Sequence, residues 1–153
     1  MNDMNDLTVS LFGHREIHDL YYLEKTLAPI IKGLMKNEAY VSFLIGRNGD
    51  FDEIAASVIK SAQKETELKN SDLTLVLPYS VSNVEYYERY YDSIIIPDSL
   101  HNVHPKAAIT LKNQWMVERS ELVIAYVGHR NGGAYKAMKY AQKLNKKVIN
   151  IFP

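Results

Sequence analysis

The sequence contains no cysteine. Disulfide bonds, thiolate metal sites and a cysteine nucleophile are therefore excluded, and the chain fits a reducing compartment. It also lacks any apolar stretch of the roughly 20 residues that a transmembrane helix needs. Its first residues, Met1 to Asp6, are polar and acidic, so they do not resemble a signal peptide. We therefore expect a cytoplasmic protein that does not enter a membrane.

The sequence has no excess charge of either sign, because 18 lysines and arginines balance 18 aspartates and glutamates. Such a chain has no global field that attracts it to nucleic acid or to an anionic membrane. Its 153 residues, 46% hydrophobic and 24% charged, are typical of one globular domain. We therefore expect a single domain over residues 1–153 and do not expect nucleic acid among its partners.

Short apolar runs rich in β-branched residues alternate with amphipathic helical patterns along the whole chain. The expected strands cover residues 8–12, 41–45, 73–77, 93–96, 122–127 and 147–151. The expected helices cover about 17–35, 54–62, 83–92, 105–116 and 132–144. This alternation predicts an α/β fold, namely a single Rossmann-like, doubly wound and mostly parallel sheet flanked by helices.

The helical segments also carry local signals. Asp50 or Asp52 is expected to cap the second helix. Leu111 and Trp115 are expected to face the core from the fourth helix. The tyrosines at 86, 87, 90 and 91 form a stripe on the third helix. Such a stripe indicates packing against the sheet or a homodimer surface ahead of a base-stacking platform.

Two copies of the tripeptide Gly-His-Arg follow expected strands. Gly13-His14-Arg15 comes after the first strand, and Gly128-His129-Arg130 comes after the fifth. In open α/β sheets, ligands bind beyond the carboxyl ends of the strands where the strand order reverses. In the common doubly wound order these two strands are neighbours, so both tripeptides flank that crevice. Glycine lets backbone amides approach a ligand and arginine neutralises phosphate, although solvated arginines after strand-closing glycines are an equally good interpretation.

Gly132 and Gly133 directly precede the last helix. Glycine lets the backbone wrap an anion while the helix N-terminus presents free N–H groups and the positive end of its dipole. The pair is neither a Walker A loop nor a complete GxGxxG fingerprint, and an ordinary turn is the alternative. The five histidines show no metal-ligand spacing, so no metal site is predicted.

The loop after the second expected strand is polar and ends in two carboxylates. It contains Gly46, Arg47, Asn48 and Gly49, followed by Asp52 and Glu53 at the start of a helix. Either carboxylate is a candidate for orienting a ribose hydroxyl or for acting as a general base. Stabilisation of the helix start is at least as good an explanation for each of them taken singly.

Several segments, in this order, resemble the YpsA-like branch of the SLOG superfamily. They are Phe12–Arg15, Leu75–Tyr79, Asn113–Ala125, Gly132–Ala134, Lys139–Ala141 and Lys147–Ile151. The resemblance covers nearly the whole chain and implies a Rossmann-like fold with a nucleotide-type ligand at the glycine-bearing loops. The superfamily also contains LOG enzymes, which cleave the base from nucleoside monophosphates. DNA-processing proteins that bind single-stranded DNA, and suspected nucleotide sensors, belong to it as well.

The LOG signature is matched only in part. Met116 and Arg119 match its Met-x-x-Arg element, and Gly132 and Gly133 match the first two glycines of PGGxGTxxE. Lys139 stands where LOG enzymes carry the catalytic glutamate. An ordinary lysine cannot accept a proton at neutral pH or stabilise an oxocarbenium ion. LOG-type hydrolysis is therefore disfavoured, and Arg119 is expected as a buried or phosphate-facing charge.

The leading hypothesis is a sensor, carrier or sequestering module that binds a nucleotide or a nucleotide-derived molecule, for example an NAD derivative, without a certain cofactor. Its expected ligand-binding residues are Gly13, His14, Arg15, Gly46, Arg47, Asn48, Gly49, Asp52, Arg119, Gly128, His129, Arg130, Gly132 and Gly133. The alternative is an N-glycosidic hydrolase or transferase with Asp52, Glu53 and Arg119 as candidate catalytic residues. Single-stranded DNA binding, by fold analogy, comes third because the net charge is zero.

Overall fold

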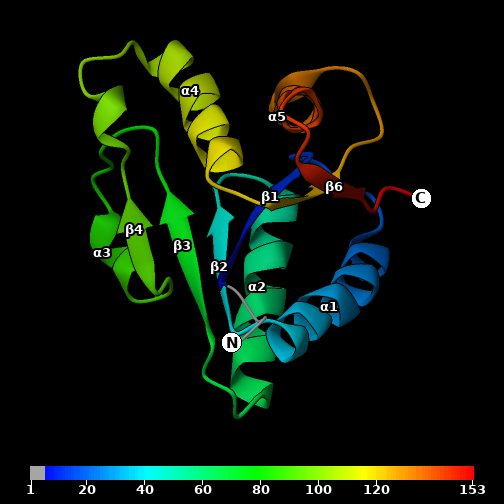
Figure 1. The fold of residues 1–153 in the computed structure, drawn as a ribbon. Coiled ribbons are helices and arrows are strands. Elements are labelled where there is room, and N and C mark those ends of the chain that lie inside the picture. The colour runs from blue at the N-terminus through cyan, green and yellow to red at the C-terminus, as the bar shows by residue number, and fades with distance from the viewer. Residues whose placement is uncertain (1–5) are drawn as a thin grey trace.

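The computed structural model describes residues 6–153, which form a six-stranded parallel sheet flanked by helices (Figure 1). The strands are β1 (Asp6–Gly13), β2 (Tyr40–Ile45), β3 (Ser71–Val76), β4 (Ser93–Ile95), β5 (Leu122–Tyr126) and β6 (Lys147–Asn150). The helices are α1 (Leu20–Asn37), α2 (Asp50–Glu65), α3 (Val84–Glu88), α4 (Pro105–Glu118) and α5 (Gly132–Lys143), with a short 3-10 turn, η1 (Asp98–Leu100). The predicted α/β fold is confirmed. Most of the amino-terminal segment discussed above, residues 1–5, lies outside the described residues.

The strand order places a reversal at the centre of the sheet. The order is β4-β3-β2-β1-β5-β6, and every neighbouring pair is parallel. The chain therefore runs outward from β1 to β4 and then crosses back to place β5 on the other side of β1. The last residue of β1, Gly13, lies opposite Tyr126 of β5. The expectation that the first and fifth strands are neighbours is confirmed, and the crevice lies beyond their carboxyl ends.

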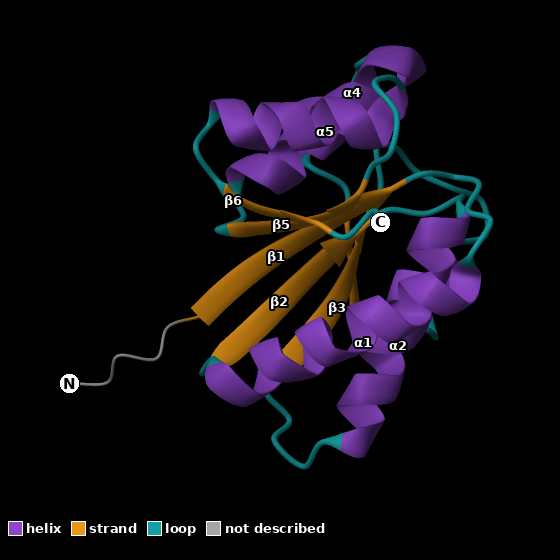
Figure 2. Ribbon diagram, turned by 90° about the vertical axis from the view of Figure 1, so that its right-hand side faces the viewer, coloured by secondary structure: helices purple, strands orange, loops and turns teal. Residues whose placement is uncertain are grey.

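The helices cover the two faces of the sheet in pairs, with α1 and α2 on one face and α4 and α5 on the other (Figure 2). Successive strand residues point to opposite faces. Leu11 accordingly packs into the core under α1 and α2, while Phe12 packs with Met116 of α4 and Ala137 of α5. Within residues 6–153, no helix has the length and the apolar character to cross a bilayer.

Several local expectations about the helices are wrong. The N-cap of α2 is Gly49, which offers no side chain, and the Asp50 carboxylate instead accepts a hydrogen bond from the backbone N–H of Ile17 at 2.9 Å. On α4, Leu111 is 40% exposed and packs into no core cluster. The expectation for Trp115 holds in part, because its side chain packs against the core cluster and stays only partly buried.

The third helix is shorter than expected. It ends at Glu88, and none of its residues is buried, so no core contact holds a longer helix in place. The backbone continues to Asp92 in turns, with Tyr90 N–H donating to Tyr87 O at 3.0 Å. Tyr86 is 68% exposed, so the tyrosine stripe does not pack as a whole against the sheet.

Candidate functional site

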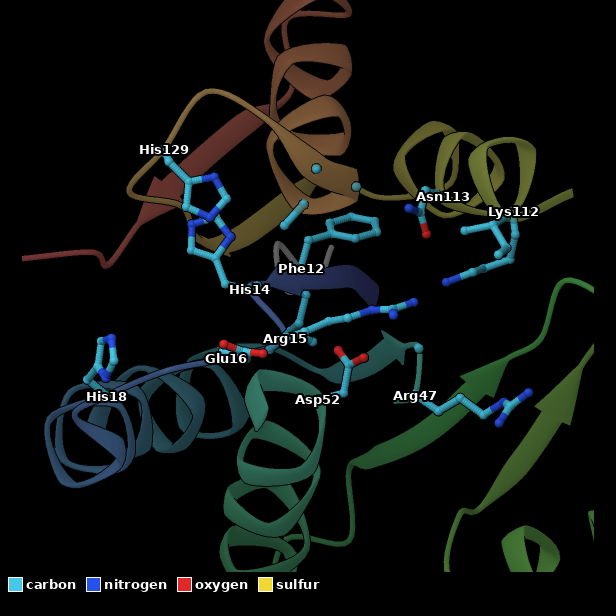
Figure 3. Close-up of a pocket in the computed structure, with 17 residues that line it drawn as sticks. Phe12, His14, Arg15, Glu16, His18, Arg47, Asp52, Lys112, Asn113 and His129 are labelled. Carbon is cyan, nitrogen blue, oxygen red and sulfur yellow. The ribbon is translucent and has the colours of Figure 1, made fainter. Parts of the chain in front are cut away.

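A cavity of about 650 Å³ opens at the carboxyl edge of the sheet, where the strand order reverses (Figure 3). This volume is in the range of small-molecule sites. Its lining comes from the end of β1, the loops after β1, β2 and β5, the first turns of α2 and α5, and the middle of α4. The lining residues are Leu11, Phe12, Gly13, His14, Arg15, Glu16, His18, Gly46, Arg47, Asp52, Ile109, Lys112, Asn113, His129, Gly132, Gly133 and Ala134.

The loop after β1 is held against the start of α2. The backbone N–H of Asp50 donates to Arg15 O at 2.8 Å, and the Asp50 carboxylate accepts from Ile17 N–H. A Cβ atom on Gly49 would lie 3.0 Å from Arg15 Cα, so glycine permits this close approach. The backbone of Arg15 is thereby fixed, and its side chain extends across the cavity (Figure 3).

The start of α5 presents backbone N–H groups to the cavity. Gly132 has a φ of +89°, a left-handed conformation that glycine adopts without strain. The N-cap residue, Asn131, makes no side-chain hydrogen bond to the helix, and the first turn contains no acidic residue. The first N–H groups of a helix have no partner within it, and together with the helix dipole they favour an anion.

A buried lysine and a partly buried aspartate flank Gly46 on the cavity floor. Lys112 of α4 is 8% exposed, and it forms no ion pair with Asp52 within the described part of the chain. A Cβ atom on Gly46 would lie 2.9 Å from Lys112 Nζ and 3.8 Å from Asp52 Oδ2. The two charged atoms are thus close neighbours that do not touch. Both atoms therefore lie at the same point of the cavity floor, next to the backbone of Gly46.

Burial shifts the pKa of both groups. It raises the pKa of Asp52 to about 6, although the positive charges of Lys112 and Arg15 oppose the shift. It also lowers the pKa of Lys112 to about 8, with Asp52 opposing and Arg47 adding to the shift. A pair of perturbed titratable groups in a cleft is typical of a functional site.

The cavity lining carries more positive than negative charge near its floor. Arg15 and Lys112 point toward each other from opposite sides of the cavity in Figure 3, with the Asp52 carboxylate beside them. The guanidinium of Arg47 turns away from them, donating to Asn48 Oδ1 at 3.1 Å and lying 5.8 Å from the centre of the Tyr87 ring. Two converging cations with one carboxylate favour an anionic ligand.

Two histidines join the two sides of the crevice at its outer end. The rings of His14 and His129 stack with their centroids 3.7 Å apart, and Gly128 N–H donates to His14 Nε2 at 2.8 Å. His14 is therefore neutral at Nε2 in this arrangement. Burial and the charge of His129 lower the pKa of His14.

The structure brings many of the expected site residues together. Those that line the cavity are Gly13, His14, Arg15, Gly46, Arg47, Asp52, His129, Gly132 and Gly133. Those outside its lining are Asn48, Gly49, Glu53, Arg119, Gly128 and Arg130. Arg119 is exposed at the carboxyl end of α4, where its guanidinium lies 4.0 Å from the Trp115 ring centre. It is therefore neither buried nor directed at this cavity.

The sequence interpretation missed the contribution of α4. Lys112, Asn113 and Ile109 line the cavity beside Glu16, His18 and Phe12. A signal for Lys112 was present, because Ala108, Lys112 and Met116 have the four-residue spacing of one buried helix face. A lysine at a core-facing position is rarely fully buried unless it has a partner or a function.

No family model matches the chain, and no curated protein matches it. Its fold resembles that of DNA processing protein A. The protein from Streptococcus pneumoniae superposes with a TM-score of 0.67 at 14% identity, covering 93% of this chain and 49% of that one. The protein from Helicobacter pylori, described for its single-stranded DNA binding mode, superposes with a TM-score of 0.62 at 18% identity. That match covers 93% of this chain and 63% of the other.

These matches support the resemblance at the level of the fold. This chain spans less than two thirds of either DNA processing protein, and identity below 20% carries no information on activity. The matches show a Rossmann-like α/β fold, and the SLOG superfamily stays a prediction from the sequence. The YpsA-like branch stays a prediction.

Proposed function

We propose that this chain binds a nucleotide or a nucleotide-derived molecule in the crevice between β1 and β5, as a sensor, carrier or sequestering module of the YpsA-like kind. The observation that carries the proposal is Lys112, a buried ammonium group without an ion-pair partner in the described chain that faces a cavity beside the start of α5. An unpaired buried cation is costly for the fold, so a bound anion is its natural complement.

Phosphate fits this position better than a carboxylate does. Lys112 and Arg15 supply two positive charges, and the start of α5 supplies N–H donors, which matches the several oxygens and the double charge of a terminal phosphate. Asp52 lies beside Lys112 and accepts hydrogen bonds, as a ribose hydroxyl group requires. The proposed ligand therefore places its phosphate at Lys112 and its ribose near Asp52.

Isothermal titration calorimetry with the four nucleoside 5′-monophosphates, adenosine and NAD tests the proposal. We expect at least one phosphorylated ligand to bind, and adenosine to bind at least about tenfold more weakly than AMP. Lys112→Met should lower the affinity for the nucleotide at least about tenfold, the scale of one charge-assisted hydrogen bond. Lys139→Met, on an exposed part of α5 outside the cavity, is the matched control and should bind normally. Absence of binding by every nucleotide at millimolar concentration would overturn the proposal.

A second candidate is N-glycosidic cleavage of the bound nucleotide with Asp52 as the general base. The observation in its favour is the placement of Asp52 in the cavity with a pKa raised to about 6, close to the range that suits a general base. Glu53, the other candidate, is exposed and lies outside the cavity lining. Release of free base from a nucleoside monophosphate by the wild type, lost in Asp52→Asn, would favour this function over simple binding.

Single-stranded DNA binding is the third candidate, and the comparisons strengthen it relative to the expectation from net charge. The Helicobacter pylori protein with a similar fold is described as binding single-stranded DNA. A strand end carries the same phosphate and ribose groups as a free nucleotide, so the cavity at Lys112 fits either ligand.

A further inference from the structure

A second, smaller groove continues from the cavity along the surface between α4 and α5. It has a volume of about 250 Å³ and shares four residues with the main cavity, namely Ile109, Asn113, Gly132 and Gly133. Its outer walls carry one lysine from each helix, Lys106 on α4 and Lys136 on α5. The groove is too small for a separate nucleotide, and its shared wall makes it an extension of the main site.

The groove lies in a strongly basic part of a chain whose net charge is zero. Residues 99–153 contain nine lysines and arginines and two acidic residues, whereas residues 1–98 contain nine and sixteen. The expectation that zero net charge argues against nucleic acid therefore rested on an average over two oppositely charged parts. The basic part comprises α4, β5, α5 and β6. The two helices α4 and α5, which cover one face of the sheet (Figure 2), together carry five lysines and one glutamate.

The two acidic residues of the basic part lie away from the groove. Glu118 is at the carboxyl end of α4, where it accepts a hydrogen bond from the Tyr140 hydroxyl, and Glu121 accepts from Thr8 N–H at 2.8 Å. Among the residues that the structure describes, no carboxylate lines the groove. Lys106 and Lys136 form no ion pair within residues 6–153, so their charges are available to a ligand.

The ends of the helices add to this charge. Both α4 and α5 begin at the carboxyl edge of the sheet, so the positive ends of both dipoles point toward the groove. Ile109, which is 40% exposed, adds an apolar side chain to the lining of the groove. A phosphate with an attached sugar has this combination of one charged and one less polar part.

We propose that the groove between α4 and α5 binds the second phosphate of a phosphodiester-linked ligand whose first phosphate occupies the cavity at Lys112. The ligand class is then longer than a mononucleotide: a dinucleotide, or the end of a nucleic acid strand. Lys106 and Lys136 hold the second phosphate, and Asn113 lies between the two phosphate positions because it lines both cavities. This inference rests on the proposed function, since it takes the first phosphate position from it.

Titration calorimetry with 5′-phosphorylated deoxyadenylates of one, two and ten nucleotides tests the inference. We expect the dinucleotide to bind about tenfold more tightly than the mononucleotide. In Lys106→Gln/Lys136→Gln this gain should disappear, while the affinity for the mononucleotide changes less than about threefold. The salt dependence of dinucleotide binding should also fall by about 0.7 in the slope of log K against log salt, the value of one single-strand phosphate contact. A further gain at ten nucleotides indicates a nucleic acid strand as the source of the ligand, and equal affinity indicates a dinucleotide.

The matched control is Lys139→Gln/Lys143→Gln, which removes the same charge from exposed positions of α5 outside both cavities. It should keep the gain for the dinucleotide. An equal loss in both variants would mean that the general field of this face, and not the groove, binds the second phosphate. A wild type that binds one and two nucleotides equally well would overturn the inference and leave the proposed function standing. Failure to bind any of the three ligands would overturn both.

Discussion

The two sides of the crevice are built from similar sequence signals that serve different purposes. On the side of β1 and α2, Gly13 is packed under the buried ring of Phe51, and the first turn of α2 carries Asp50, Asp52 and Glu53. On the side of β5 and α5, Gly128 is covered by the half-exposed ring of Phe152, and the first turn of α5 carries no acid. The helix dipole is thus complemented within the chain on the first side and left for a ligand on the second.

The comparison shows that a glycine after a strand does not have one fixed structural role. Gly13 allows the core to close over the strand end, because Phe51 occupies the space that a side chain would fill. Gly128, the matching glycine of the second tripeptide, is covered only by the half-exposed Phe152 ring, and the left-handed turn at the start of α5 is made by Gly132 further along the chain. A shared tripeptide therefore predicts a shared position at the sheet edge and does not predict a shared role.

The largest difference between the two sides is expected from adding one methyl group to each Gly-His-Arg segment. In Gly13→Ala the new Cβ would lie 2.1 Å from Phe51, a ring with no exposed surface that cannot move without disturbing the core. We expect a loss of about 3 kcal/mol in the free energy of unfolding, at the upper end of the usual cost of overpacking. In Gly128→Ala the clash is with Phe152, which is 42% exposed. That ring can rotate away, so we expect a loss below about 1 kcal/mol.

Urea denaturation of both variants measures the two losses. Equal losses in the free energy of unfolding would show that Phe152 is held as firmly as Phe51. The two sides of the crevice would then not differ in how tightly these rings are packed. The wild-type slope with urea should be kept in both variants, because neither change alters the surface exposed on unfolding.

The sequence predicted the sheet well because its signals are local. Each strand is a short apolar run, and the alternation with helices leaves few topologies open. The reversal beside β1 followed from the same rules, and with it the position of the crevice. The role of Lys112 was missed because its burial depends on packing between α4, β2 and α2, which no short segment encodes.

The errors in the helices have a related cause. The tyrosines of α3 have helical spacing, but the helix ends early because no element covers it. The carboxylate of Asp50 suits a helix cap, yet the neighbouring loop offers it the N–H of Ile17. The charge asymmetry between residues 1–98 and 99–153 was legible in the sequence and was hidden by counting the whole chain together.

The next effect concerns the charged pair on the crevice floor, and Asp52→Asn is the test. When the pKa of a carboxyl group is raised on folding, its ionisation costs more in the folded state than in the unfolded state, so ionisation lowers the free energy of unfolding. The pKa of Asp52 rises from 3.8 to about 6, so the folded protein loses stability as the pH rises through this interval. Asp52→Asn should therefore be more stable than the wild type by about 1–2 kcal/mol at pH 7.5, after allowance for partial solvent exposure, and equally stable near pH 3.

The same variant, Asp52→Asn, should also change the affinity of the cavity for a phosphate-bearing ligand. Without the Asp52 charge, the cavity floor resembles the uniformly basic groove between α4 and α5, and the affinity for a phosphate-bearing nucleotide should rise several-fold at pH 7.5. The increase should shrink as the pH falls below about 6, where the wild-type carboxyl is itself protonated. Thermal denaturation and calorimetry over pH 3–8 measure both effects. Glu53→Gln, which removes an exposed charge from the same helix turn, is the control and should change neither quantity appreciably.

The smallest effect is expected where the two sides of the crevice meet, at the stacked rings of His14 and His129. Burial is the larger cause that lowers the pKa of His14, and the charge of His129 is the smaller one. In His129→Asn the pKa of His14, followed by NMR titration of its ring protons, should therefore rise but stay below its ordinary value of 6.5, because burial still lowers it. His18→Asn changes an exposed histidine of the same cavity that takes no part in the stack, and it should leave the pKa of His14 unchanged.

Because the folded-state pKa of His14 is lowered, the stability that His14 contributes is complete above pH 6.5 and is lost as the pH falls through the folded value. Protonation at Nε2 also removes the acceptor of the Gly128 N–H, so acid should loosen the β5 side first, at His129 and the start of α5. A pKa of His14 that reached 6.5 or more in His129→Asn would mean that charge repulsion between the rings, and not burial, sets the protonation of this contact.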